Sequence, residues 1–157
     1  MDQTAFDRTR IDRFFEDYVP GSEYEYGSAT LSQSDIIGFA EAYDPQPFHV
    51  DPTAAADGPF DGLIASGWQT AAVMMRLFAD HYLSHTSSLG GPGVDELRWL
   101  KPVRPGDTLT LRVKILEART SRSKPDRGLV HTRADLVNQD GDQVFGCIVI
   151  NILRRRP

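Results

Sequence analysis

The sequence predicts an α+β fold in which an antiparallel β-sheet wraps around one central, buried α-helix. The first observation behind this prediction is an apolar helical segment over residues 67–83, where Gln69, Thr70 and Arg76 are the only clearly polar residues before position 80. A helix that is apolar on nearly every side has to be covered by other parts of the protein. The second observation is a series of four predicted strands after this helix, which can supply that cover.

Alternating side chains and short turns predict these four strands. Between Thr108 and Leu116 apolar residues alternate with polar ones, so this strand has one buried and one solvated face, as in an antiparallel sheet. Turns are predicted at 104–107 (Arg-Pro-Gly-Asp) and at 139–142 (Gln-Asp-Gly-Asp). The last strand is apolar on both faces, which places it inside the sheet or at a subunit interface. The predicted strands are residues 94–103, 108–116, 128–137 and 144–153.

The N-terminal third is predicted to contain a lead-in segment, a first strand and a short helix. Residues 1–20 have mixed charges, and a short helix among them is expected to pack on the body of the protein. Residues 23–31 contain β-favouring tyrosines and are interpreted as the first strand. A serine N-cap, Ser32 or Ser34, begins a helix that runs to about Tyr43. The helix has to end there, because the prolines that follow disfavour helical backbone.

Length and composition favour one domain over residues 1–157, since a chain of 157 residues with 40% hydrophobic content can bury one substantial core. A net charge of −5 argues against a nucleic-acid partner. The single cysteine, Cys147, excludes an internal disulfide, and the N-terminus lacks the apolar run of a signal peptide. No apolar stretch approaches the roughly 20 residues of a membrane span. We therefore expect a cytoplasmic protein without a membrane partner, with 154–156 (Arg-Arg-Arg) as a solvated end.

The segment Tyr-Asp-Pro-Gln-Pro-Phe-His-Val-Asp-Pro at 43–52 carries the candidate chemistry. Its prolines exclude an ordinary amphipathic helix or alternating strand around Asp44 and His49. In an extended chain their Cα atoms would lie about 17 Å apart, so the segment must fold back if the two side chains are to meet. Ser66-Gly67 then begins the apolar helix, whose N-terminal N–H groups favour negative charge. Together these residues offer an acid, a base and an anion site.

This motif resembles that of the MaoC-like dehydratase, or (R)-specific enoyl-CoA hydratase, family. In the family signature a Pro follows an Asp by three positions and a His follows it by five, as Asp44, Pro47 and His49 do here. The segment 96–107 (ELRWLKPVRPGD) also looks like the sheet-entering segment common in these proteins, so the resemblance covers about residues 25–153. It implies a hotdog fold, subunits that form at least a homodimer, and Asp44 with His49 as the catalytic pair.

The start of the motif departs from the family pattern. Family members usually have Gly-Asp-x-Asn-Pro, whereas this chain has Tyr-Asp-Pro-Gln-Pro at 43–47, which places Gln46 where Asn is typical and adds a proline beside the acid. The acid and the base are both retained. The orientation of Asp44 and the identity of the substrate depend on this change, and the Gln46 amide is expected to hold the loop or a water.

The reaction that the resemblance implies is the reversible hydration of trans-2-enoyl-CoA to (R)-3-hydroxyacyl-CoA. His49 suits proton exchange near neutral pH, and Asp44 beside it can hold the other hydrogen of the same water. The Gly67 N–H is expected to stabilise the enolate oxygen, while Ser66 caps the helix or contacts the pair. The acyl-CoA thioester is the substrate, and no redox cofactor or metal is needed.

Two other functions remain open for the same fold. One is an acyl-CoA thioesterase, in which a carboxylate activates water against the thioester carbonyl. The other is a non-catalytic acyl-thioester binder or partner subunit. Locally, Asp44 could be a turn residue and His49 a structural histidine, and the His-x-Asp sequence at 49–51 lacks the further ligands of a metal site. Ser66 lacks the Gly-x-Ser-x-Gly context of a hydrolase nucleophile.

The remaining titratable and basic residues have weaker interpretations. His81, His85, His131 and Cys147 are expected to be structural. Six basic residues are candidates for contacts with the phosphates of CoA, although scattered surface charges are usually only solvated. They are Arg98, Lys101, Arg104, Arg122, Lys124 and Arg127.

Overall fold

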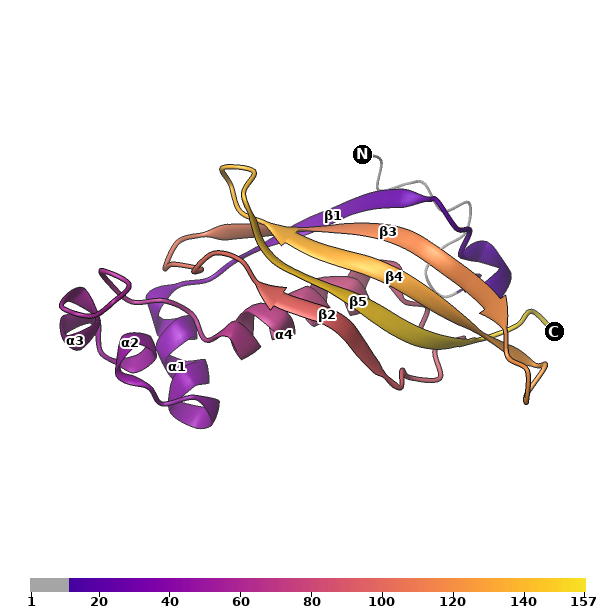
Figure 1. The fold of residues 1–157 in the computed structure, drawn as a ribbon, viewed down its shortest axis with the longest axis horizontal. Helices are drawn as coiled ribbons and strands as arrows, with labels where there is room; N and C mark the ends of the chain where they lie inside the picture. Colours follow the sequence, from indigo (N-terminus) through magenta and orange to yellow (C-terminus); the bar gives the residue numbers. More distant parts are fainter. Residues whose placement is uncertain (1–11) are drawn as a thin grey trace.

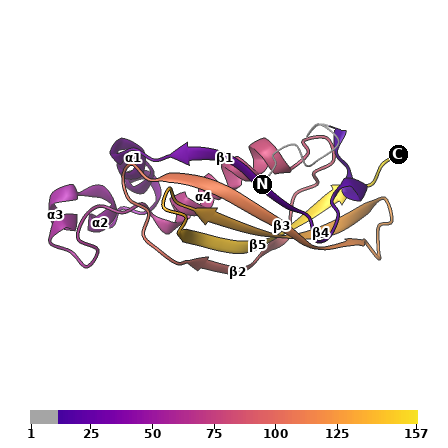
Figure 2. The same cartoon turned by 90° about the horizontal axis from the view of Figure 1, so that it is seen from above.

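The computed structural model describes residues 12–157, which form a five-stranded antiparallel sheet with a helix, α4, along one face (Figures 1 and 2). The strand order is β1-β3-β4-β5-β2. This is the hotdog arrangement that the sequence predicts. The strands are β1 (Glu23–Thr30), β2 (Gly93–Trp99), β3 (Thr108–Thr120), β4 (Arg127–Val137) and β5 (Gln143–Arg154).

Helix α4 spans Gly67–Leu77 and continues as one π-helical turn, Phe78–Tyr82. Its buried apolar side chains include Met74 and Leu77, and the π turn adds Phe78 and Tyr82 to the same core. The sheet covers only one face of the helix, and Trp68 and Met75 are 60% and 42% exposed. The sequence predicted that α4 is covered on nearly every side, but within one chain only one face is covered. Burial within one chain therefore explains only part of the apolar character of α4.

The position of β5 in the sheet agrees with its apolar sequence. It pairs with β4 over nearly its whole length and with β2 on its other side, so both of its edges are covered. The strand expected at 94–103 ends earlier, at Trp99. Beyond it the N–H groups of Leu100 and Lys101 both point to the Val144 carbonyl, so the regular ladder is lost and 100–103 form a loop.

Three short helices lie together at one end of the molecule (Figure 1). Helix α1 (Gln33–Tyr43) begins at Ser32, whose hydroxyl accepts from the Asp35 N–H while Asp35 accepts from the Ser32 N–H. This capping box and the end at Tyr43 confirm the predicted bounds. Beyond it, the proline-rich segment forms two further helices, α2 (Pro47–Val50) and α3 (Pro52–Ala56). Both begin with proline, which is compatible with the first helical position.

The two ends of the described chain are tied together. Residues 1–11 of the predicted lead-in segment lie outside the described part, and the rest includes a 3₁₀ turn, Phe15–Asp17. Arg155 pairs with Glu16 at 3.0 Å and Arg156 pairs with Asp17 at 2.6 Å. The expectation of a purely solvated arginine tail is therefore wrong, because acidic residues of the 3₁₀ turn lie beside it. None of the helices in residues 12–157 combines the length and apolar content that a membrane span needs.

Candidate active site

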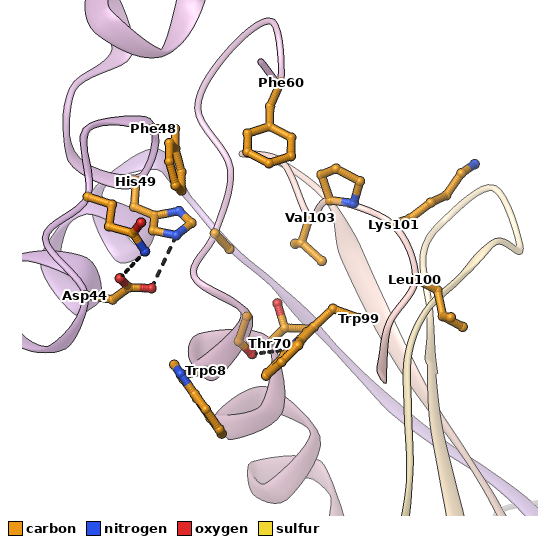
Figure 3. A pocket seen from close by; sticks show the side chains of 14 residues that line it. Asp44, Phe48, His49, Phe60, Trp68, Thr70, Trp99, Leu100, Lys101 and Val103 are labelled. Atoms are coloured by element: carbon orange, nitrogen blue, oxygen red, sulfur yellow. Dashed lines mark hydrogen bonds and ion pairs between the residues drawn. The ribbon is translucent and has the colours of Figure 1, made fainter. Parts of the chain in front are cut away.

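A pocket of about 380 Å³ lies where the α1–α2 segment, the N-terminus of α4 and the loop after β2 meet (Figure 3). One side of it is polar and carries Asp44 and His49. The opposite side comes from residues 99–103, which are apolar apart from Lys101. Its further lining residues are Gln46, Phe48, Phe60, Ala65, Gly67, Trp68 and Thr70.

The chain folds back between Asp44 and His49, as the sequence requires for them to meet. Asp44 ends α1, and the His49 N–H donates to the Gln46 carbonyl within the tight turn that leads into α2. This turn brings His49 Nε2 to 3.3 Å from Asp44 Oδ2. The His49 residue is only 4% exposed. The two candidate side chains therefore converge at the pocket, although helical turns, rather than an irregular loop, carry His49 there.

The orientation of the His49 ring is set by its other nitrogen. Nδ1 lies 2.8 Å from the Ile64 carbonyl oxygen, and a carbonyl can only accept, so Nδ1 carries a hydrogen. Nε2 then faces Asp44. In neutral imidazole this nitrogen has a lone pair, which a carboxylate oxygen repels unless a proton or a water hydrogen lies between them. The pair is therefore arranged to share a proton donor.

Asp44 accepts hydrogen bonds on both carboxylate oxygens. The Ser66 hydroxyl donates to Oδ2 at 2.7 Å and the Gln46 side-chain amide donates to Oδ1 at 2.7 Å. The Ser66 bond, followed by the Gln46 bond, lowers the pKa of Asp44, and nearby His49 adds to this effect against the opposing effect of burial. Asp44 is thus held as a carboxylate that accepts hydrogen bonds. Gln46, which departs from the family motif, is bonded directly to this acid.

We expect Gln46→Met to raise the pKa of Asp44 toward its ordinary value, because one of the two donated hydrogen bonds is lost. Ionised Asp44 stabilises the fold above its unfolded pKa, and this stabilisation is lost as pH falls through the folded pKa. The variant should therefore lose stability at a higher pH than the wild type. Carboxyl NMR titration and thermal unfolding at acid pH measure the two effects. Gln33→Met, at an exposed glutamine of α1, is the control, and equal titration of Asp44 in both variants would contradict the expectation.

Ser66 and Gly67 form the start of α4 beside this pair. Ser66 is fully buried, and its Oγ accepts from the Trp68 N–H at 3.2 Å while its hydroxyl donates to Asp44. Ser66 therefore both caps α4 and contacts the acid, whereas the sequence had indicated these two roles as alternatives. The Gly67 N–H has no hydrogen-bond acceptor among the described residues, and Gly67 lines the pocket. This N–H is available to an oxygen of a bound ligand.

Trp99 is a pocket residue that sequence reasoning missed. Its indole N–H donates to the Gly67 carbonyl at 2.7 Å, and a Cβ on Gly67 would lie only 2.6 Å from the ring. The sequence predicted Gly67 as an N–H donor, whereas in the structure its missing side chain also makes room for the Trp99 ring. The aromatic residue in the segment 96–107 was visible, but nothing local indicated its contact with Gly67. Phe48 and Phe60, which pack edge to face at 5.3 Å, were missed for the same reason.

The six basic candidates for phosphate contacts separate into groups. Lys101 lines the pocket and pairs with Asp142 at 2.6 Å, and Arg104 donates to the carbonyl of the pocket residue Phe60. Arg98 lies on β2. The other three lie in or next to the β3–β4 turn, at the opposite end of the sheet from α1–α3 (Figure 1). They are Arg122, Lys124 and Arg127.

The residues expected to be structural lie away from the pocket. The His81 ring stacks on Tyr26 at 5.5 Å, and Cys147 is buried in β5, where burial raises the pKa of its thiol to about 11. Within residues 12–157, no three His, Cys, Asp or Glu side chains are grouped so as to hold a metal ion.

Comparison with known proteins identifies relatives over most of the chain. Residues 17–137 match the family model of the MaoC like domain. A crystal structure of a MaoC-like dehydratase from Rhodospirillum rubrum is 38% identical, with a TM-score of 0.86, over 92% of this chain and 99% of that chain. The uncharacterized protein YdeM of Bacillus subtilis is 31% identical, over 83% of this chain and 91% of its own length. The 3-hydroxybutyryl-CoA dehydratase of Methylorubrum extorquens is also 31% identical, over 82% and 80%.

Proposed function

Because the chain belongs to the MaoC-like family of hydratases and dehydratases, we propose that this hydro-lyase hydrates trans-2-enoyl-CoA reversibly to (R)-3-hydroxyacyl-CoA. The observation that carries the proposal is the approach of His49 to Asp44 at 3.3 Å in a pocket that also contains the start of α4. The related dehydratase of Methylorubrum extorquens is named for 3-hydroxybutyryl-CoA, and this compound belongs to the substrate class that we propose.

In the proposed reaction, one water lies between His49 and Asp44. Asp44 accepts one hydrogen of this water, and His49 Nε2 accepts the other as the oxygen attacks the β-carbon. The electron pair of the double bond moves toward the thioester carbonyl and forms an enolate. The proton taken up by His49 is then delivered to the α-carbon, so that H and OH add to the same face. Dehydration follows the reverse path.

The enolate oxygen is proposed to accept a hydrogen bond from the Gly67 N–H. This group belongs to the first turn of α4, where unpaired N–H groups and the helix dipole favour negative charge. The apolar side of the pocket would hold the acyl chain and exclude water. Lys101 is proposed to meet the CoA phosphates, which requires it to exchange its partner Asp142. These steps use only the side chains and backbone of the protein and need no redox cofactor or metal.

The test is a direct assay with purified protein and a panel of trans-2-enoyl-CoA substrates of different chain length. Hydration should remove the enoyl absorbance without releasing a free thiol, and chiral analysis should find the (R)-3-hydroxyacyl product. Thiol release would instead identify a thioesterase. Binding of acyl-CoA across the panel without turnover of either kind would identify a non-catalytic binder and overturn the proposal.

We also propose that the protein forms at least a homodimer. An exposed apolar face of the chain supports this proposal. Within residues 12–157, β2 is an edge strand with one unpaired side. Val94 on β2 and Met75 on α4 are 47% and 42% exposed. Both residues line a second pocket, so they lie on a common face. An unpaired edge beside exposed apolar side chains favours association of subunits.

We expect Val94→Asp and Met75→Glu each to shift the protein from dimer to monomer, because a charge would be desolvated in the interface. Sedimentation velocity over a range of concentrations measures the shift. Leu116→Asp is the matched control, since Leu116 is similarly exposed, at 44%, but lies on β3. Equal sedimentation of all three variants and the wild type would place the interface elsewhere.

A further inference from the structure

Trp99 is in contact with the start of α4 although the two are 32 positions apart in sequence. Its indole N–H bonds to the Gly67 carbonyl, its ring packs against the Gly67 backbone, and it meets Trp68 edge to face at 5.1 Å. Figure 3 shows the ring of Trp99 on the side of the pocket that faces Asp44 and His49. The residue is thus both a wall of the pocket and an anchor for the first turn of α4.

A continuous series of hydrogen bonds leads from this indole to the candidate acid. The Trp99 N–H donates to the carbonyl of the Gly67–Trp68 peptide at 2.7 Å, and the N–H of the same peptide donates to Ser66 Oγ at 3.2 Å. The Ser66 hydroxyl then donates to Asp44 Oδ2 at 2.7 Å. Every donor in the series points toward Asp44, so each bond polarises the next in the same sense.

We propose that Trp99 is a positioning residue, whose indole N–H holds the Gly67–Trp68 peptide and, through it, the Ser66 hydroxyl and the Asp44 carboxylate in their working geometry. Its effect on turnover rests on the proposed hydratase function, whereas its effect on Asp44 does not. The second tryptophan of the chain differs from Trp99 in this respect. Within the described residues, the Trp68 side chain has the ring contact with Trp99 and no hydrogen bond from its indole N–H, and it is 60% exposed.

Among the described residues, His49 and Lys101 are the charged or titratable side chains that line the pocket together with Asp44. His49 faces it from α2 at 3.3 Å. Lys101 lines the same pocket from the loop after β2 and is paired with Asp142. Trp99 has no hydrogen bond to either group among the described contacts. If loss of the Trp99 indole N–H changes the pKa of Asp44, the effect is therefore transmitted through the series of hydrogen bonds that includes Gly67 and Ser66.

The experiment compares Trp99→Phe with Trp68→Phe. Both variants keep an aromatic ring and lose one indole N–H, but only the first breaks the series of hydrogen bonds. We expect Trp99→Phe to raise the pKa of Asp44, measured by NMR titration of labelled aspartate carboxyls, because Ser66 becomes a weaker and less ordered donor. Trp68→Phe should leave this titration unchanged. With an enoyl-CoA substrate, Trp99→Phe should lower kcat about 5-fold, the loss expected for one hydrogen bond, with less than a twofold change in KM.

The Asp44 titration tests the positioning role of Trp99, whereas the kinetics with enoyl-CoA also test the proposed hydratase function. If Asp44 titrates alike in the two variants and in the wild type, the positioning role of Trp99 is overturned, whatever the activity. If the titration moves in Trp99→Phe alone, the positioning role holds even where no enoyl-CoA is turned over, and only the proposed function fails. A change in KM in Trp99→Phe, with neither kcat nor the Asp44 titration altered, would leave Trp99 as a wall of the pocket alone and would overturn its positioning role.

Discussion

Replacing His49 by Ala or Asp44 by Asn is expected to lower kcat with an enoyl-CoA substrate at least about 10²-fold, the low end for the loss of general acid–base catalysis. His49→Ala removes the nitrogen that exchanges the proton with water and the α-carbon. Asp44→Asn keeps the shape of the side chain but removes the negative charge that accepts from Ser66 and lies 3.3 Å from His49. Stopped assays at saturating substrate measure both effects.

Folding has to be controlled in these variants because His49 is buried and bonded to the Ile64 carbonyl. His49→Gln, which fills more of the space than Ala, should be equally inactive and retain the circular dichroism spectrum of the wild type. His85→Ala, at an exposed histidine, should retain full activity. A folded His49 or Asp44 variant with rates like the wild type would remove the proposed mechanism.

Replacing Gly67 by Ala is expected to lower kcat by a factor comparable to that of the His49 and Asp44 substitutions. In Gly67→Ala the new Cβ would lie 2.6 Å from atoms of the Trp99 ring, so the ring must move and its bond to the Gly67 carbonyl is strained or lost. The ring lines the pocket beside the proposed oxyanion donor, so its displacement alters the pocket at that point. Because misplacement by about 1 Å or loss of one oxyanion donor each costs about 10²-fold, we expect kcat to fall by about that factor. Steady-state kinetics and a thermal melt measure the change.

The steric conflict between the new Cβ at position 67 and the Trp99 ring also predicts that substitutions at the two positions are non-additive. In a Trp99→Ala background there is no ring to displace, so Gly67→Ala should cost much less there than in the wild type. A second glycine, Gly38, lies in α1 with no heavy atom near its missing Cβ, and Gly38→Ala is the control that should leave kcat unchanged. If Gly67→Ala lowers kcat equally in both backgrounds, contact with Trp99 is not the reason for glycine at this position.

Local sequence patterns predicted most of the secondary structure. The alternation around 108–116 correctly predicted β3, which continues to Thr120. Of the two predicted N-caps, Ser32 and Ser34, the structure has Ser32 at the start of α1. Main-chain hydrogen bonds and side-chain periodicity act over a few residues, so they are visible in sequence. The short helices α2 and α3 were not predicted, because the prolines that disfavour helical backbone before them also suit the first position of a helix.

The sequence by itself determined the fold class, the central apolar helix and the pair Asp44 and His49 as candidates. Only the tertiary structure decided that His49 Nε2 faces Asp44, that Ser66 both caps α4 and bonds the acid, and that Trp99 packs on Gly67. The Ser66 and Trp99 contacts join residues 22 and 32 positions apart. Such contacts depend on how whole elements pack against each other, and no local periodicity encodes that packing.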